Sequence, residues 1–138
     1  MLRVRDADAS ARVHSYILGL EATTSILGRM VFMRASGDSS HELVLMSVGK
    51  SVPGPEPDRV GLYHFVWEME SLDDLRRIYR ELQQKGVNIA GIGDHGILLG
   101  VYLFDPEGNE IKVFYELPRD QWSDRQAFDG RFPGSLED

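Results

Sequence analysis

The chain has 138 residues, of which 42% are hydrophobic, and this is enough for one compact domain with a hydrophobic core. Its 15 basic and 22 acidic residues give a net charge of −7, and no basic run alternates with aromatic residues, which argues against nucleic acid as a partner. Because it has no cysteine, no signal peptide and no long apolar run, the sequence predicts a cytoplasmic protein without a membrane partner, in which any metal ligands are nitrogen or oxygen atoms.

The first half of the chain begins with a strand-like end at residues 2–4, followed by a helix. Asp6 is a typical helix cap, and Gly19 lies where the helix should end. The residues predicted to form its buried face are Ala9, Val13, Tyr16 and Ile17.

Two strands are then expected at residues 28–35 and 41–48, joined by a turn at residues 36–40. Residues 49–60 hold three of the six prolines and predict a stiff, extended linker.

A strand is predicted at residues 61–69, where bulky residues alternate with smaller or polar ones. The bulky set is assigned to the core, and it consists of Tyr63, Phe65, Trp67 and Met69. His64 and Val66 therefore point to the opposite face of the sheet.

The next helix starts with a capping pattern, in which Ser71 is followed three residues later by Asp74, and it stops at Gly86. Strands are expected at residues 97–104 and 110–115, joined by a tight turn at residues 105–109. In the last strand the alternation separates Ile111, Val113 and Tyr115 from Lys112 and Phe114.

The two halves read as a repeat. Aligning the residues before each helix gives an offset of 65, and aligning the turn glycines gives 71. Equivalent positions of two such modules converge on one cavity, so His41 is predicted to pair with Lys112, and His64 and Tyr102 to face the same cavity. The partner of His64 would precede Met1, so the first strand is expected to be truncated.

Several of these motifs, taken in order, resemble the vicinal oxygen chelate superfamily, which includes glyoxalase I, bleomycin-resistance proteins and extradiol dioxygenases. The residues that carry the resemblance are 61–64, 71–75, 94–96 and 102–109. Within the superfamily, the sequence is most similar to catechol 2,3-dioxygenase-like proteins.

The resemblance implies an α+β fold of two tandem βαβββ modules, residues 1–48 and 61–116, whose curled sheets form a shared cavity. These modules and the linker would make a single domain of residues 1–118. Residues 119–138, with irregularly spaced aromatic residues, are expected to form an arm that lies on the domain or on the second subunit of a homodimer.

If the protein is an enzyme, the resemblance implies an extradiol ring-cleavage dioxygenase, an oxidoreductase that uses divalent iron or manganese. His64 matches a metal ligand, His95 and Tyr102 match residues that assist catalysis, and His41 matches a position near the substrate. Lys112 stands where the family has its carboxylate ligand, and the second histidine would precede Met1. The expected metal site is therefore incomplete.

The alternative is a metal-free relative that binds a small aromatic molecule, as resistance proteins do. Its cavity would be lined by Val66, Leu98, Tyr102, Phe104 and Phe114, and the ammonium group of Lys112 would contact an anionic ligand. Lys112, Phe114 and Val66 are the predicted substrate-binding residues in either case. A glyoxalase-like isomerase is a third possibility.

Overall fold

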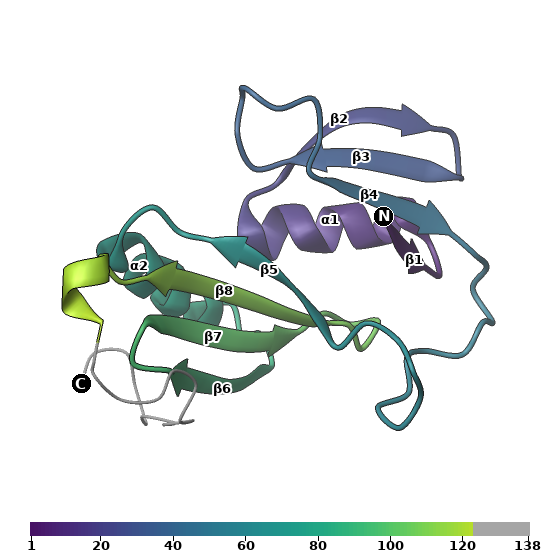
Figure 1. The fold of residues 1–138 in the computed structure, drawn as a ribbon. Helices are drawn as coiled ribbons and strands as arrows, with labels where there is room; N and C mark the ends of the chain where they lie inside the picture. The colour runs from purple at the N-terminus through teal and green to yellow at the C-terminus, as the bar shows by residue number, and fades with distance from the viewer. Residues whose placement is uncertain (123–138) are drawn as a thin grey trace. The chain divides into compact units, whose positions relative to one another are not determined.

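The computed structural model describes residues 1–122, which belong to two compact units, one of residues 1–56 and one that begins at residue 57. Each unit contains a four-stranded sheet and one helix, in the order strand, helix and three strands (Figure 1). The α+β fold of two tandem modules is therefore confirmed, and the boundary between the units falls inside the predicted linker. The shared cavity stays a prediction.

In the first unit the strand order is β1-β4-β3-β2, with β1 and β4 parallel and the other pairs antiparallel. The bounds are Leu2–Val4 for β1, Ala7–Leu18 for α1, Glu21–Ile26 for β2, Met30–Arg34 for β3 and Leu43–Ser47 for β4. Helix α1 packs against β3 and β4, and Val31, Met33 and Leu45 are buried in this core.

Helix α1 begins and ends where the sequence predicts. The carboxylate of Asp6 accepts hydrogen bonds from the backbone of Asp8 and Ala9 at 3.0 and 3.1 Å, and Gly19 has a φ of 70°. The predicted buried face is wrong in part, because Tyr16 is 60% exposed. The residues that are buried are Ala7, Ser10, Ala11, His14 and Ile17.

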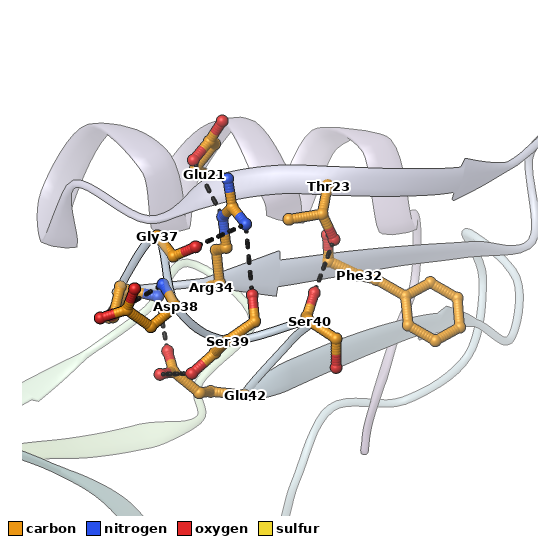
Figure 2. Close-up of polar contacts among 11 residues, drawn as sticks. Glu21, Thr23, Phe32, Arg34, Gly37, Asp38, Ser39, Ser40 and Glu42 are labelled. Atoms are coloured by element: carbon orange, nitrogen blue, oxygen red, sulfur yellow. Dashed lines mark hydrogen bonds and ion pairs between the residues drawn. The ribbon is translucent and has the colours of Figure 1, made fainter.

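A network of polar contacts holds the loop between β3 and β4 (Figure 2). The guanidinium group of Arg34 pairs with Glu21 on β2 at 3.1 Å and donates to two carbonyl groups of the loop, those of Gly37 and Ser39. The carboxylate of Glu42 accepts hydrogen bonds from the Ser39 hydroxyl and from the backbone N–H of Ala35. The predicted turn at residues 36–40 is thus fastened at both ends.

In the second unit the strand order is β5-β8-β7-β6, with β5 and β8 parallel. The bounds are His64–Glu68 for β5, Leu72–Gln84 for α2, Ile89–Asp94 for β6, Leu98–Phe104 for β7 and Glu110–Glu116 for β8. Helix α2 contacts β8 and lies along one face of this sheet (Figure 1). The buried core contains Leu75, Tyr79, Leu82, Val101, Leu103, Ile111 and Val113.

Both ends of α2 and the last hairpin agree with the predictions. The Ser71 hydroxyl accepts a hydrogen bond from the backbone N–H of Asp74 at 3.1 Å, and Gly86 follows the helix with a φ of 67°. In the turn between β7 and β8, the carboxylate of Asp105 accepts hydrogen bonds from the backbone and side-chain amide of Asn109 at 2.8 and 3.1 Å.

Two strands, β2 and β6, were not predicted. Every residue of β2 is exposed, so neither face of this strand is selected to be apolar, and its sequence does not alternate between apolar and polar residues. Strand β6 contains two glycines in six residues and a register shift between Ile89 and Gly91. Both lie at the edge of their sheet, where only one side of the strand is paired.

The assignment of Tyr63 to the core is also wrong. Strand β5 begins one residue later, at His64, and Tyr63 is 79% exposed. The side chains of Phe65 and Trp67 are half-buried on the helix-facing side of the sheet, as predicted.

The strand ladders correct the offset of the repeat. Leu2 pairs with Leu45 in the first unit, and its equivalent at an offset of 65, Trp67, pairs with Val113 in the second. The final strands therefore correspond at an offset of 68 (113 less 45), not 71.

With the corrected offset, Lys112 corresponds to Val44 and His41 corresponds to Asn109. The predicted pairing of His41 with Lys112 is therefore wrong. The turn glycines on which the offset of 71 was based lie in loops of different lengths, and an odd shift in register moves a side chain to the opposite face of a strand.

The described part of the predicted arm, residues 119–122, is a single turn of 3₁₀-helix, Arg119–Gln121, followed by Trp122. The indole N–H of Trp122 donates to the carbonyl of Leu117 at 2.8 Å, and the Arg119 guanidinium lies 4.4 Å from the indole ring centroid. The rest of the arm, with Phe128 and Phe132, lies outside the described residues. Within residues 1–122, no helix is long and apolar enough to cross a membrane.

Candidate functional site

The sheet of the second unit has one face against α2 and one face that carries polar and aromatic side chains. Alternation along the strands directs Ile111 and Val113 to the helix and their neighbours to the other side. We call the group gathered on that second face the Lys112 cluster. It consists of His64, His95, Tyr102, Glu110, Lys112 and Phe114.

His64 and Glu110 are opposite each other in the parallel ladder of β5 and β8. The Nδ1 atom of His64 lies 3.2 Å from the Glu110 carboxylate, and the two side chains are 27% and 12% exposed. A carboxylate on one ring nitrogen fixes the orientation of an imidazole and leaves the other nitrogen, Nε2, for a ligand or a proton.

Lys112 is the most unusual member of the cluster because it is only 7% exposed. Its ammonium nitrogen lies 5.1 Å from the ring centroid of Tyr102 and 5.7 Å from that of Phe114. Within residues 1–122, no carboxylate pairs with it. Burial lowers the pKa of Lys112 below its usual value. Within residues 1–122, the faces of these two rings are the groups that attract its positive charge.

Two glycines make room for these side chains. A Cβ atom built on Gly100 of β7 would lie 2.7 Å from Cε of Lys112, so the lysine stem occupies the space that a larger residue would need. A Cβ on Gly93 of β6 would lie 3.1 Å from both His95 Nε2 and Tyr102 Cε2. The close packing of the cluster therefore depends on the absence of side chains at both positions.

His95 and Tyr102 form the second polar pair of the cluster. His95 begins the turn between β6 and β7, where its backbone N–H donates to Leu98 and the next residue, Gly96, has a φ of 78°. The turn brings Nε2 of His95 to 3.0 Å from the hydroxyl of Tyr102, and the imidazole tautomer decides which group donates.

Electrostatics favour the neutral form of Tyr102. Burial, with a smaller contribution from the negative charge of Glu110, raises the pKa of the Tyr102 phenol above its usual value. The phenol therefore keeps its proton at neutral pH and is available as a hydrogen-bond donor.

The other predicted lining residues differ in exposure. Val66, the cross-strand neighbour of Lys112 on β5, is 48% exposed, whereas Leu98 at the start of β7 is buried and Phe104 at its end is half-buried. Alternation puts all three on the same face as the cluster.

His41 belongs to the first unit and lies in the loop just before β4, not within the predicted strand. Its side chain is exposed, its Nδ1 atom is 3.1 Å from the Ser40 hydroxyl, and its ring meets Phe32 edge-on at 5.2 Å between centroids. The role of His41 near a substrate stays a prediction.

The first unit also has an open hollow of about 440 Å³ at the start of α1. It is lined by Arg5, Asp6, Asp8, Gly28, Ser47, Gly49 and Lys50, none of which is a predicted site residue. Its lining contains two carboxylates and two cations, so it does not favour one sign of ligand charge.

Residues 1–113 match the family model described as the Glyoxalase/Bleomycin resistance protein/Dioxygenase superfamily. The chain belongs to this superfamily. The family resemblance inferred from the sequence motifs is therefore confirmed, and the superfamily contains both enzymes and resistance proteins by its own description.

Two relatives of this superfamily member are dioxygenases. It is 29% identical over 127 residues to a catechol-2,3-dioxygenase of Bacillus subtilis (strain 168), an alignment that covers 91% of this chain and 44% of the relative. It is 28% identical over 86 residues to biphenyl-2,3-diol 1,2-dioxygenase 2 of Rhodococcus globerulus, covering 62% of this chain and 43% of that one. This chain thus spans less than half the length of either relative.

Among solved structures, a glyoxalase/dioxygenase from Nostoc punctiforme has the same fold, with a TM-score of 0.70 at 21% identity. The superposition covers 85% of this chain and 88% of the other. This similarity supports the architecture of two modules and says nothing about the ligand.

The side chains present do not fit the metal site that the superfamily's dioxygenases imply. Within residues 1–122, no three His, Asp or Glu side chains gather where they could hold one ion. Lys112 brings a positive charge to the position of the expected carboxylate, and the carboxylate of Glu110, two residues away on the same strand, is engaged with His64. The set of histidine and carboxylate ligands that such an iron site needs is therefore incomplete within residues 1–122.

Glu110 is the one member of the cluster that the sequence did not reveal. It lies two residues before Lys112 and so shares its face of β8, a signal that was present in the alternation. Its contact with His64 depends on the register between β5 and β8, which are paired through residues 46 positions apart.

Proposed function

We propose that this protein binds a small anionic aromatic compound at the Lys112 cluster and does so without a metal ion. The observation that carries the proposal is the environment of Lys112, a buried ammonium group that lies beside two aromatic rings and has no carboxylate partner within residues 1–122. A buried charge without a counter-ion costs free energy, and an anionic ligand would supply that counter-ion.

The aromatic part of the ligand is argued from the neighbours of the lysine. The rings of Tyr102 and Phe114 flank the ammonium group on adjacent strands, and Val66 adds an apolar side chain at the next position across the sheet. A flat ring could pack against these groups while its acidic substituent reaches Lys112 and the Tyr102 hydroxyl donates a hydrogen bond. Benzoate and phenol-like acids have this combination.

Calorimetric titration with benzoate tests the proposal, with benzamide as the neutral ligand of similar shape. A charge-assisted contact contributes roughly 1.5–3 kcal/mol, so Lys112→Ala should weaken benzoate binding about tenfold or more and leave benzamide binding nearly unchanged. Lys50→Ala is the matched control, since the Lys50 side chain is 88% exposed. Equal affinity for the two ligands, or equal loss in both variants, would contradict the proposal.

A second candidate is a ring-cleaving dioxygenase with His64 as a metal ligand. It is favoured by the orientation of His64, whose Nδ1 atom is held by Glu110, and by the two relatives, which are dioxygenases. Anaerobic titration with ferrous ion, followed by catechol and dioxygen, separates the candidates. Stoichiometric iron with ring cleavage would support the enzyme, and substoichiometric iron with benzoate binding would support the metal-free protein.

A further inference from the structure

The chain has three lysines, and their environments differ in a way that matters for covalent chemistry. The Lys50 side chain is 88% exposed and lies 4.0 Å from the Asp6 carboxylate, and Lys85, the C-cap residue just after α2, is partly exposed. Lys112 is buried among side chains of its own sheet. The nucleophilic form of a lysine is the neutral amine, which water and carboxylates disfavour and which burial favours.

Burial favours that neutral form at Lys112, because the two ring faces return only part of the free energy that the charge loses on leaving water. Its stem lies over Gly100, and within residues 1–122 the groups around its nitrogen are the faces of two aromatic rings. The titratable groups on the same face are Tyr102 from β7, His64 and Glu68 from β5, Glu110 and Glu116 from β8, and His95 from the turn before β7. Glu110 is engaged with His64 and His95 with Tyr102, whereas Glu68 and Glu116 are exposed at the other end of their strands.

We infer that Lys112 is a nucleophilic lysine that forms an imine with an aromatic aldehyde carrying an acidic oxygen next to the carbonyl group. The inference rests on the ligand site proposed above and adds a covalent step to it. The amine nitrogen bonds to the carbonyl carbon to give a carbinolamine, and the carbonyl oxygen then leaves as water with the two hydrogens of the amine. No oxidant or reductant takes part, and hydrolysis reverses the step.

The choice of aldehyde follows from charge and shape. The imine nitrogen takes up the proton of the neighbouring ring hydroxyl, so a positive charge stays where the ammonium was and the contacts with the faces of Tyr102 and Phe114 are retained. An oxygen anion on the adjacent ring carbon provides the counter-ion that no carboxylate of residues 1–122 supplies at this position. The simplest compound of this class is 2-hydroxybenzaldehyde.

The test is reductive trapping of the full chain with 2-hydroxybenzaldehyde and sodium cyanoborohydride at neutral pH. Peptide mass spectrometry then locates the adduct, whose mass is that of the aldehyde less one oxygen atom. Lys112 should be modified several-fold more than Lys50 or Lys85, because burial lowers its pKa and so leaves a larger fraction of it as free amine. Saturating benzoate should suppress modification of Lys112 alone, and the N-terminal amine serves as an exposed internal reference.

Two variants complete the test. Lys112→Arg keeps the positive charge and cannot form the imine, so it should lose trapping while it still binds benzoate. Lys112→Met, which removes a buried charge, is the second variant in case arginine does not fit over Gly100. Modification that follows exposure, with Lys50 labelled more than Lys112, would overturn the inference.

The outcome also distinguishes the two proposals from each other. Benzoate binding without trapping at Lys112 would leave the ligand site standing and remove the imine. Trapping at Lys112 that benzoate does not suppress would remove the anion site and leave a reactive lysine. The absence of both would overturn both.

Discussion

Replacing Lys112 by methionine should make the protein more stable at neutral pH. Methionine has a similar length and flexibility and a polarizable sulfur that packs well against aromatic rings such as those of Tyr102 and Phe114. Burying an ion costs roughly 3 kcal/mol or more after relaxation, and the two ring faces return about 1–2 kcal/mol. The substitution should therefore raise the free energy of unfolding by about 1–2 kcal/mol.

The pH dependence of this gain follows from the lowered pKa. Between the pKa of Lys112 in the folded protein and its usual value of 10.5, the unfolded chain binds more protons than the folded one. The stability of the natural protein therefore increases with pH across that range because of this residue. The advantage of Lys112→Met should be largest at neutral pH and should disappear as the pH approaches the usual lysine value.

Urea unfolding of both proteins, followed at several pH values from neutral to alkaline, measures this difference directly. Other titrating groups are common to both chains, so the difference between the two curves isolates Lys112. Lys50→Met is the control and should change stability by only a few tenths of a kcal/mol, because its side chain is 88% exposed. A less stable Lys112→Met protein, or a gain that does not vary with pH, would refute the reasoning about an uncompensated buried charge.

Two further substitutions test the geometry of the cluster. Gly100→Ala places a methyl group 2.7 Å from Cε of Lys112, so it should displace the ammonium and weaken benzoate binding about fivefold, roughly 1 kcal/mol of the anion contact, as measured by calorimetry. Glu110→Gln removes a negative charge beside Tyr102, so the pKa of the Tyr102 phenol should fall toward its usual value of 10.0, although burial keeps it above that value. Ultraviolet absorbance of tyrosinate against pH, with Tyr102→Phe as the reference, measures this shift.

Each of these variants has a matched control. Gly91→Ala adds a methyl group to the neighbouring strand, where nothing lies within 4 Å, and should leave benzoate affinity unchanged. Glu116→Gln removes a charge from the exposed end of β8 and should leave the titration of Tyr102 as it is. An equal effect of Gly91→Ala and Gly100→Ala on benzoate binding would show that the lysine stem is not what the added group displaces.

The parts of the fold that local chemistry determines could be predicted from the sequence. The Asp6 and Ser71 caps and the Asp105 turn depend on residues within a few positions of one another, and all three are present. Strand β2 could not be predicted because it is exposed along its whole length and has no apolar pattern. Strand β2 is stabilised by its pairing with β3, and a prediction made from each segment separately does not take such pairing into account.

In the candidate site too, the features set by a single strand could be predicted and those set by the pairing of distant strands could not. Alternation along single strands correctly grouped His64, Tyr102, Lys112 and Phe114 on the face of the sheet away from α2. The contact between His64 and Glu110 was not predicted, because it depends on which residues of two distant strands face each other. The error in pairing His41 with Lys112 has the same origin, since loop length, not sequence motif, sets that register.

The position of β5 in its sheet has a consequence for how the cluster assembles. Strands β6, β7 and β8 follow one another as hairpins, whereas β5 joins β8 in parallel across a separation of 46 residues between His64 and Glu110. Closing that long loop is entropically costly and slow compared with hairpin formation. During refolding, the pair of His95 and Tyr102 should therefore appear with the hairpins, and His64 should reach Glu110 only when β5 docks, so that the imidazole is the last group of the cluster to arrive.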